Sequence, residues 1–195
     1  VMTWETVESP AFDEAEVPPN VLAAGTSGVV AVGPGGAIFV CPDGRDWTPS
    51  ADPALAQGGV GDLAVWREGM VAVGGYCHRD PGEADHCHAA VWLSADGVTW
   101  TRVPDQESLS GPRGTGMSAV TAGGPGLVAV GVYDPDQFNT HAAVWLSADG
   151  LTWTRVAPEL IEGEGAEEPT VVGRHASEPS QFGQAAMLDV TVGGP

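Results

Sequence analysis

A fifteen-residue stretch that occurs twice is the strongest constraint on the fold of this chain. The letters AAVWLSADGVTWTRV fill residues 89–103, and AAVWLSADGLTWTRV returns at 142–156 with one residue changed. A weaker third copy, GAIFVCPDGRDWTPS, fills residues 36–50, so that Asp43, Asp96 and Asp149 follow one another at intervals of 53 residues. A fixed period of roughly 40–50 residues is typical of the blades of a β-propeller.

Each repeat can be divided into four short strands. In the best copy these are residues 117–122, LVAVG at 127–131, AAVWLS at 142–147 and LTWTRV at 151–156, separated by Gly-rich and Asp-Gly turns. The second strands, VVAVG, MVAVG and LVAVG, are continuously apolar, as expected for strands covered on both faces. No stretch has a helical period over eleven residues. We predict an all-β fold, a β-propeller of four-stranded antiparallel blades, with three complete blades at about 21–50, 61–104 and 116–157.

Both ends of the chain fall inside a repeat. VMTWETV lines up with GVTWTRV, which makes Trp4 part of a fourth strand, and AAMLDVTVGGP places Val190 in the first-strand column of Leu63 and Val120. We therefore expect a partial blade at each end, and an acidic loop between blades over residues 157–184. The ring is expected to be completed by further sequence, to roughly six to eight blades, or by another chain.

Two of the turns carry a family resemblance. SADGVTW and SADGLTW resemble the Asp-box of sialidase-like β-propellers, with one residue fewer between Asp and Gly than in the family pattern. The whole unit is similar to the repeat of secreted actinobacterial propellers of that type. Physically, such a box is a turn device, because its Asp accepts hydrogen bonds from its own turn and its Gly tolerates a left-handed backbone. The residues expected to have this structural role are Asp43, Ser94, Asp96, Gly97, Trp100, Ser147, Asp149, Gly150 and Trp153.

The charge of the chain argues against several classes of partner. The formal net charge is −19, and all seven basic residues are arginine. Such an acidic chain repels nucleic-acid phosphates and anionic membranes. No apolar run approaches the roughly 20 residues of a membrane span. We expect neither nucleic-acid binding nor membrane insertion, and attribute the acidity to a GC-rich genome or to adaptation to high salt.

Two cysteines bracket the segment CHRDPGEADHC between the second and third strands of the middle repeat. Because the strands of a hairpin lie side by side, Cys77 and Cys87 are predicted to form a disulfide that closes a nine-residue loop. The alternatives are free thiols, or a zinc site made with neighbouring histidines. These histidines are His78, His86 and His88. A disulfide, together with the resemblance to secreted propellers, indicates an extracellular or cell-surface location.

Loop lengths indicate where a ligand would bind. The turns between first and second strands, and between third and fourth, are minimal, whereas the connections at the other end of the blades are long. Function tends to lie on variable loops above a rigid scaffold. We therefore predict ligand-binding residues in the two loops that follow VAVG. They are Tyr76, His78, Asp80, Glu83, Asp85, His86, His88, Tyr133, Asp134, Asp136, Asn139 and His141.

Two chemical roles are considered for these loops. The oxygen atoms of Asp134, Asp136 and Asn139 could hold calcium, with a solvated acidic loop as the alternative, and no other cofactor is indicated. A sialidase-like glycosidase would need an arginine cluster, a tyrosine nucleophile and an acid, but the arginine-bearing RIP element of that family is missing and no carboxylate pair stands out. The leading hypothesis is a noncatalytic propeller that binds a protein or glycan. The alternative is a fragment of a sialidase-like glycoside hydrolase propeller.

Overall fold

The computed structural model describes residues 6, 9–13, 18–25, 28–78, 86–112, 114–124, 126–134 and 140–157. Helical structure in these residues is confined to short segments, namely α1 (Pro10–Asp13), η1 (Pro34–Gly36), α2 (Pro53–Ala56) and η2 (Glu107–Leu109). None of the helices described here has the length and apolar character needed to cross a bilayer. The prediction of an all-β fold is confirmed.

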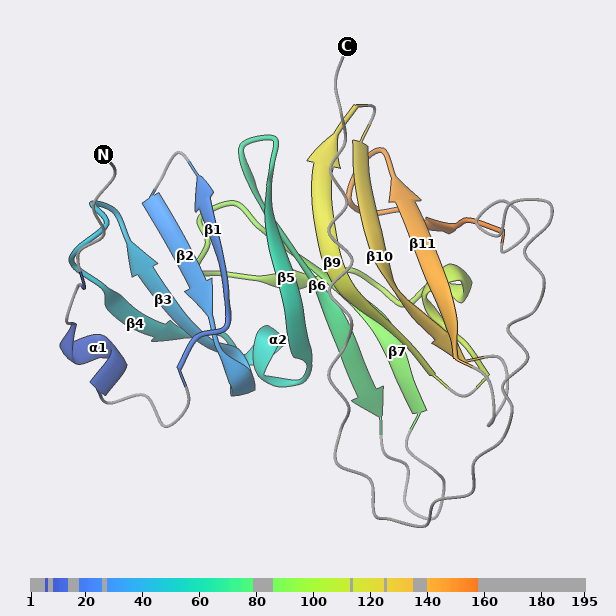
Figure 1. Ribbon diagram of the computed structural model, residues 1–195, viewed down its shortest axis with the longest axis horizontal. Coiled ribbons are helices and arrows are strands. Elements are labelled where there is room, and N and C mark those ends of the chain that lie inside the picture. Colours follow the sequence, from blue (N-terminus) through green and yellow to red (C-terminus); the bar gives the residue numbers. More distant parts are fainter. Residues whose placement is uncertain are drawn as a thin grey trace.

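The strands form a four-stranded and an eight-stranded sheet, which divide into three consecutive four-stranded blades (Figure 1). Within a blade each strand pairs antiparallel with the next, and a single parallel bridge, Cys87 with Gly114, joins the second and third blades. Blade 1 consists of β1 (Val21–Gly25), β2 (Gly28–Val32), β3 (Ala37–Cys41) and β4 (Thr48–Ala51). Blade 2 consists of β5 (Gly59–Trp66), β6 (Gly69–His78), β7 (His86–Ser94) and β8 (Thr101–Arg102). Blade 3 consists of β9 (Gly114–Gly123), β10 (Gly126–Asp134), β11 (His141–Ser147) and β12 (Thr154–Arg155). The predicted partial blades fall on residues outside those described, apart from residue 6, which belongs to no helix or strand.

The hydrophobic core lies between the blades, because successive side chains of a strand point to opposite faces of its sheet. On β6, Met70 and Ala72 belong to the cluster shared with blade 1, whereas Val71 and Val73 belong to the cluster shared with blade 3. All four side chains are buried. The continuous apolar run in the sequence therefore reflects a strand that is covered on both faces.

A glycine at the start of each second strand lets the second and third strands approach closely. A Cβ atom placed on Gly69 would lie 2.3 Å from the carbonyl oxygen of Ser94, and one placed on Gly126 would lie 2.1 Å from that of Ser147. Both distances are far shorter than any tolerated contact, so no side chain fits at these positions. The repeated glycine is thus a packing requirement of the blade.

Short helical turns connect the blades and lock each one to the next. The indole Nε1 of Trp92 in blade 2 donates a hydrogen bond of 2.9 Å to the carbonyl oxygen of Ala54 in α2. In blade 3, Trp145 Nε1 donates to the carbonyl oxygen of Ser108 in η2 at 2.8 Å. Next to each acceptor is a buried leucine, Leu55 in α2 and Leu109 in η2. The two joints between blades are therefore built alike.

Candidate functional site

The long-loop end of the blades is the lower end in Figure 1, where the chain passes from β6 to β7 and from β10 to β11. The β6–β7 hairpin pairs Tyr76 with His88, Cys77 with Cys87, and His78 with His86. The strands thus extend into a segment that the sequence suggested was loop. The ladder continues because the predicted disulfide between Cys77 and Cys87 joins the strands, with 4.0 Å between their Cα atoms. The two sulfurs bond to each other, so the alternative zinc site lacks its thiolates.

The structure describes only part of the predicted ligand set. Tyr76, His88, Tyr133, Asp134 and His141 lie on strands at the long-loop end, and for His78 and His86 only the backbone is described. The remaining candidates lie outside the described residues, and they are Asp80, Glu83, Asp85, Asp136 and Asn139. Among the residues that are described, no three His, Cys, Asp or Glu side chains are grouped so as to hold a metal. The calcium site remains a prediction.

Two stacked tyrosine–arginine pairs flank this end. The guanidinium carbon of Arg102 lies 4.2 Å from the ring centre of Tyr76, and that of Arg155 lies 3.8 Å from the ring centre of Tyr133. Such a cation–π contact contributes about 0.5–1 kcal/mol at an exposed site and more when desolvated. The sequence placed both arginines only as repeat positions. The signal for the pairs is that a tyrosine follows VAVG in the same two repeats in which TWTR ends the blade.

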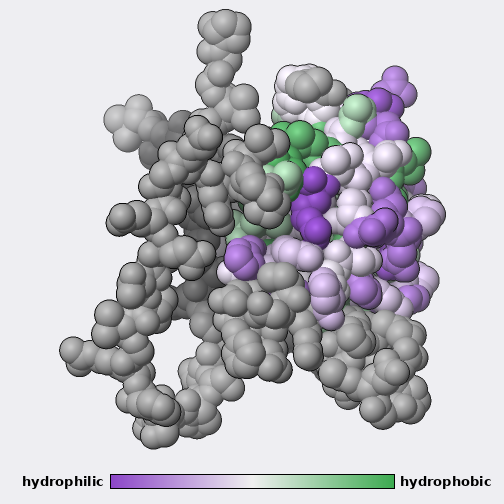
Figure 2. Space-filling view, turned by 90° about the vertical axis from the view of Figure 1, so that its right-hand side faces the viewer, coloured by the Kyte–Doolittle hydropathy of each residue, from purple (hydrophilic) through white to green (hydrophobic). Residues whose placement is uncertain are grey.

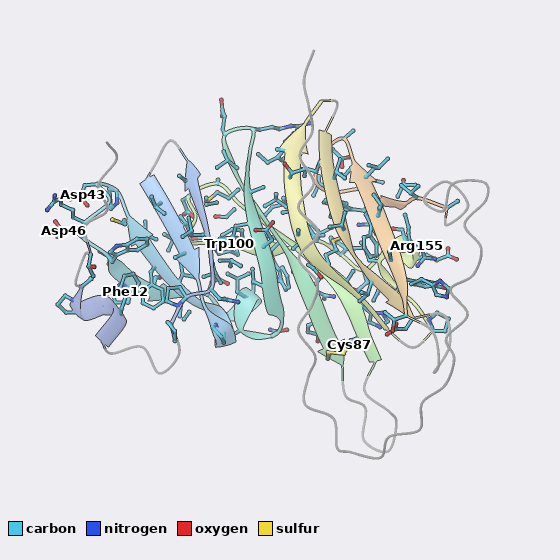
Figure 3. All side chains as sticks on the ribbon, viewed as in Figure 1. Phe12, Asp43, Asp46, Cys87, Trp100 and Arg155 are labelled. Atoms are coloured by element: carbon cyan, nitrogen blue, oxygen red, sulfur yellow. A yellow bond between two sulfur atoms is a disulfide. The ribbon has the colours of Figure 1, made fainter. Side chains whose placement is uncertain are left out.

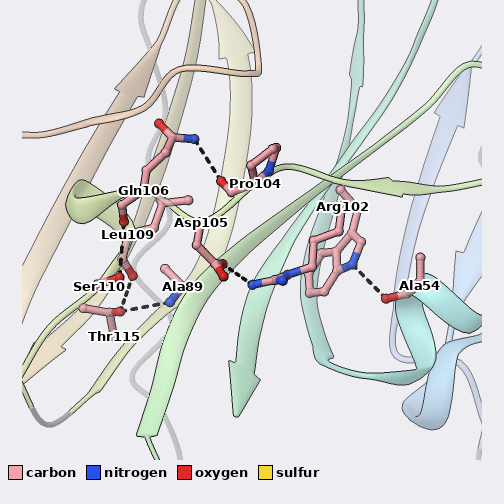
Figure 4. A network of polar contacts seen from close by, with 10 residues as sticks. Ala54, Ala89, Arg102, Pro104, Asp105, Gln106, Leu109, Ser110 and Thr115 are labelled. Atoms are coloured by element: carbon pink, nitrogen blue, oxygen red, sulfur yellow. Dashed lines mark hydrogen bonds and ion pairs between the residues drawn. The ribbon is translucent and has the colours of Figure 1, made fainter. Parts of the chain in front are cut away.

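Each of these arginines is also held by a second contact. Arg102 forms an ion pair with Asp105 (Figure 4). Arg155, labelled in Figure 3, donates through Nη1 to the carbonyl oxygen of Ser110 at 3.4 Å. The guanidinium groups are therefore fixed between the tyrosine rings and the segments that connect the blades. Their role in the described structure is to position the two tyrosines.

Three polar atoms near this end are buried without a hydrogen-bond partner among the described residues, namely Nε of Arg102, which stacks on Tyr76, Nδ1 of His88 and Oδ1 of Asp134. The last two lie on the long strands. Their positions are related through strand pairing, because Asp134 lies opposite Gly114 on β9, and Gly114 lies opposite Cys87, the residue before His88. Neighbouring strands are roughly 5 Å apart. The backbones of His88 and Asp134 are therefore separated by two strand spacings, about 10 Å, at the end of blades 2 and 3. Because side chains alternate, His88 shares the face of Ala90 toward blade 1, whereas Asp134 lies on the face of blade 3 opposite to Tyr133.

Thr115 links blades 2 and 3 at this end through two hydrogen bonds. Its side chain is buried, and its hydroxyl oxygen accepts a 2.9 Å hydrogen bond from the backbone N–H of Ala89 on β7 (Figure 4). The same hydroxyl donates to the carbonyl oxygen of Leu109 in η2. One side chain therefore joins blade 2, the connecting turn and blade 3. The sequence analysis missed this residue because its position is not part of the repeated stretch.

The Ser-Asp turns lie at the opposite end of the blades, and their carboxylates are engaged. Asp96 Oδ1 accepts hydrogen bonds from the backbone N–H groups of Thr99 and Val98, at 2.7 and 2.8 Å. Asp149 makes the equivalent bonds in blade 3. These backbone donors hold the pKa of both carboxyl groups below the ordinary value. The aspartates therefore stabilise turns and are not free to act as acids or bases.

The first copy of the turn follows the same design with a cysteine in place of the serine. Asp43 Oδ1 accepts from the backbone N–H groups of Asp46 at 2.8 Å and Arg45 at 2.9 Å. These bonds lower the pKa of Asp43 to about 2. Cys41 is buried with a free thiol, and its Sγ lies 3.5 Å from Asp43 Oδ1.

No protein-family model matches the sequence, and no curated protein matches it. Among solved structures, the chain is similar to the GH32 beta-fructofuranosidase BmSUC1 of Bombyx mori, with 12% identity over 66% of this chain and a TM-score of 0.46. A mutant of the same enzyme in complex with sucrose matches at 13% identity over 76% of this chain, with a TM-score of 0.47. Sucrose-6-phosphate hydrolase from Lactobacillus gasseri matches at 15% identity over 71%, with a TM-score of 0.49.

This chain spans 31, 38 and 34% of the length of those three chains. At these scores the fold assignment rests on the strand pairing described above.

Proposed function

We propose that the chain is part of a β-propeller that binds a glycan at the long-loop end of blades 2 and 3. The observation that carries the proposal is the pair of unpartnered buried atoms, His88 Nδ1 and Asp134 Oδ1. A buried polar atom without a partner costs about 1–3 kcal/mol. A sugar hydroxyl both donates and accepts hydrogen bonds, so hydroxyls on different units of one extended glycan can satisfy the carboxylate oxygen and the ring nitrogen.

The surrounding framework is suited to such a ligand because it is already fixed. The disulfide between Cys77 and Cys87 staples the hairpin that carries His88. The stacked arginines hold Tyr76 and Tyr133 on the two blades. Less conformational entropy is lost on binding when the site is ordered beforehand.

A propeller of a glycoside hydrolase is the second candidate, since the similar structures are enzymes that act on sugars. Hydrolysis with retention requires two carboxyl groups roughly 5 Å apart. Asp62 is occupied, because its two oxygens accept from the backbone N–H groups of Leu63 and Val120, each at 2.8 Å. Asp105 is paired with Arg102. Asp134 thus supplies the one buried carboxylate oxygen left without a partner in the described residues, and binding is the function this geometry favours.

The proposed location is outside the cell. A disulfide persists in an oxidising compartment, and extracellular glycans are available to a protein there. The Cys77–Cys87 bond supports this location.

The test is a glycan array probed with the full chain. His88→Ala and Asp134→Ala are each expected to lower the affinity for a bound glycan by roughly tenfold, equivalent to one lost hydrogen bond to a partly buried group. Glu68→Gln is the matched control, because Glu68 is an exposed charged residue in the β5–β6 turn at the opposite end. Thermal melting of each variant checks that the fold is retained.

Three outcomes are distinguishable. Binding that is lost in both long-loop variants and kept in Glu68→Gln supports the proposal. The proposal is overturned if no glycan on the array binds, or if a glycan binds both variants with the affinity of the parent chain. The same preparations are incubated with sucrose and with sialosides. Release of free sugar that is lost on substitution of Asp134 would favour the hydrolase over the noncatalytic binding protein.

A further inference from the structure

The last residues of strand β6 are supported differently from the corresponding residues in blade 3. Beyond Gly75, which pairs with Gly59 at the start of β5, strand β6 has β7 as its only paired neighbour in the described residues. These residues are Tyr76, Cys77 and His78, called the β6 end below. A two-stranded ribbon without a third strand is marginally stable in water. The β6 end therefore needs a further restraint.

In blade 3 the equivalent strand end is paired on both edges. Tyr133 on β10 lies opposite His141 on β11 and opposite Thr115 on β9. Val132, the residue before it, is 41% exposed, and Figure 2 shows this side of the molecule with hydrophobic residues exposed among hydrophilic ones. Pairing at the two edges, and not a covered face, therefore holds this strand end in place.

In blade 2 a disulfide takes the place of the third strand. Cys77 of the β6 end is bonded to Cys87 of β7, and β7 is itself bridged to β9 through Cys87 and Gly114. A cross-link that closes a short loop restrains the chain by removing its open conformations. The bond therefore ties the β6 end to a strand that is anchored independently of it.

The β6 end carries one side of the candidate site. Tyr76 lies directly opposite His88, and side chains at opposite positions of an antiparallel pair lie about 5 Å apart on the same face. The Nδ1 atom of His88 is buried at this place. Stacking on Arg102 also restrains Tyr76, but such a contact is much weaker than a covalent bond. Release of the β6 end would move Tyr76 away from His88, expose Nδ1 to water and remove the order of the site.

We propose that the Cys77–Cys87 disulfide is a redox switch for the candidate site. A dithiol that reduces the bond releases the β6 end and lowers the affinity for the glycan, and reoxidation restores both. The regulation of binding rests on the proposed glycan function, whereas the opening of the hairpin does not.

The exchange reaction begins at Cys77, because this residue is exposed and Cys87 is half-buried. A thiolate of the dithiol attacks Sγ of Cys77, the sulfur–sulfur bond breaks, and Cys87 leaves as a thiolate that takes up a proton. The second sulfur of the reductant then attacks the first one within the mixed disulfide, and Cys77 is released as a thiol. Two electrons and two protons pass to the cysteines, and the dithiol becomes a disulfide.

The test compares hydrogen exchange of the full chain before and after reduction with dithiothreitol. Peptides covering residues 75–78 are expected to exchange at least about tenfold faster in the reduced protein, and those covering 131–134 to be unchanged. The double variant Cys77→Ser, Cys87→Ser should show the faster rate with and without dithiothreitol. Cys41→Ser is the matched control, because serine occupies the equivalent position in the other two blades, and this variant should respond to dithiothreitol as the parent does.

Faster exchange confined to residues 75–78 supports the switch. Equal acceleration at residues 131–134 overturns it, because the bond would then hold the whole fold, and so does an unchanged rate at both places.

Binding is measured with a glycan from the array, and reduction should lower its affinity by at least about tenfold. Unchanged affinity despite an open hairpin would overturn the regulation and leave the proposed function intact. If no glycan binds, the proposed function and the regulation of binding fail together, and the exchange data still decide whether the bond controls the hairpin.

Discussion

Replacing Thr115 by valine tests how the blades are held together. Valine has nearly the shape of threonine and lacks the hydroxyl, so the substitution changes hydrogen bonding with little change of volume. The hydroxyl serves two buried backbone groups, the N–H of Ala89 and the carbonyl of Leu109, which lie on different sides of the joint between blades 2 and 3.

The magnitude follows from leaving both groups without a partner. Each buried backbone group that loses its hydrogen bond costs about 1–3 kcal/mol, so Thr115→Val should lower the free energy of unfolding by about 2–6 kcal/mol. At about 2–4 °C per kcal/mol for a chain of this size, the melting temperature should fall by roughly 5 °C or more. Thr115→Ser keeps the hydroxyl and loses one methyl group, which should cost about 1 kcal/mol.

Urea unfolding of the three proteins measures these differences, and hydrogen exchange at the Ala89 amide locates them. In Thr115→Val this amide should exchange faster, because it has lost its acceptor. A valine variant within about 0.5 kcal/mol of the parent, the size of an ordinary surface substitution, would refute the reasoning. A serine variant as unstable as the valine variant would also refute it, since packing and not the hydrogen bonds would then be responsible.

Three further predictions concern the blades themselves. Gly126→Ala should lower the free energy of unfolding by at least about 2 kcal/mol in urea titrations, because its Cβ would lie 2.1 Å from the facing carbonyl oxygen of β11. Gly123→Ala is the control, since a Cβ there meets nothing within 4 Å. Equal losses of stability in the two variants would contradict the prediction. Joint replacement of Cys77 and Cys87 by serine should cost about 3 kcal/mol from the entropy of the unfolded chain, and an unfolding midpoint insensitive to dithiothreitol would argue against this value. Asp43 has a pKa of about 2 in the fold against 3.8 as the ordinary value, so its carboxylate stabilises the fold above pH 3.8 and this contribution is lost as the pH falls toward 2. The stability gap between the parent and Asp43→Asn should therefore narrow over that range, and a gap that stays constant would exclude the proposed linkage.

The blades could be predicted from the sequence because the features that specify them are local and repeated. The VAVG strands, the glycine that precedes them and the Asp-Gly turns recur at the same spacing, and each determines a local structure. The Cys77–Cys87 disulfide was predictable for a related reason, since two cysteines that flank a hairpin loop lie on adjacent strands. Such features need no knowledge of distant contacts.

The joints between blades were not predictable in the same way. The backbone N–H of Trp100 donates to Asp52 and that of Trp153 donates to Gln106, so one role is filled by a carboxylate in one joint and by an amide in the other. Thr115 occurs at one joint only. A search for identical letters misses contacts of this kind, because the geometry is repeated and the chemistry is not.

The candidate site, too, could be predicted only in part. Sequence reasoning placed Tyr76 and Tyr133 at the long-loop end but not the arginines that stack on them, because each contact joins the second and fourth strands of a blade. It also treated Tyr76 and His88 as loop residues, whereas they pair across β6 and β7. Polar composition alone does not distinguish an extended hairpin from a loop.

The most direct test of a glycan site at the long-loop end is a nuclear magnetic resonance titration of the labelled full chain with the strongest ligand from the array. We expect the signals of Tyr76, His88, Tyr133 and Asp134 to shift on binding, and those of the turn aspartates to stay unchanged. Shifts confined to the opposite end, around Asp96 and Asp149, would contradict it, as would a titration in which no glycan moves any of the four long-loop signals.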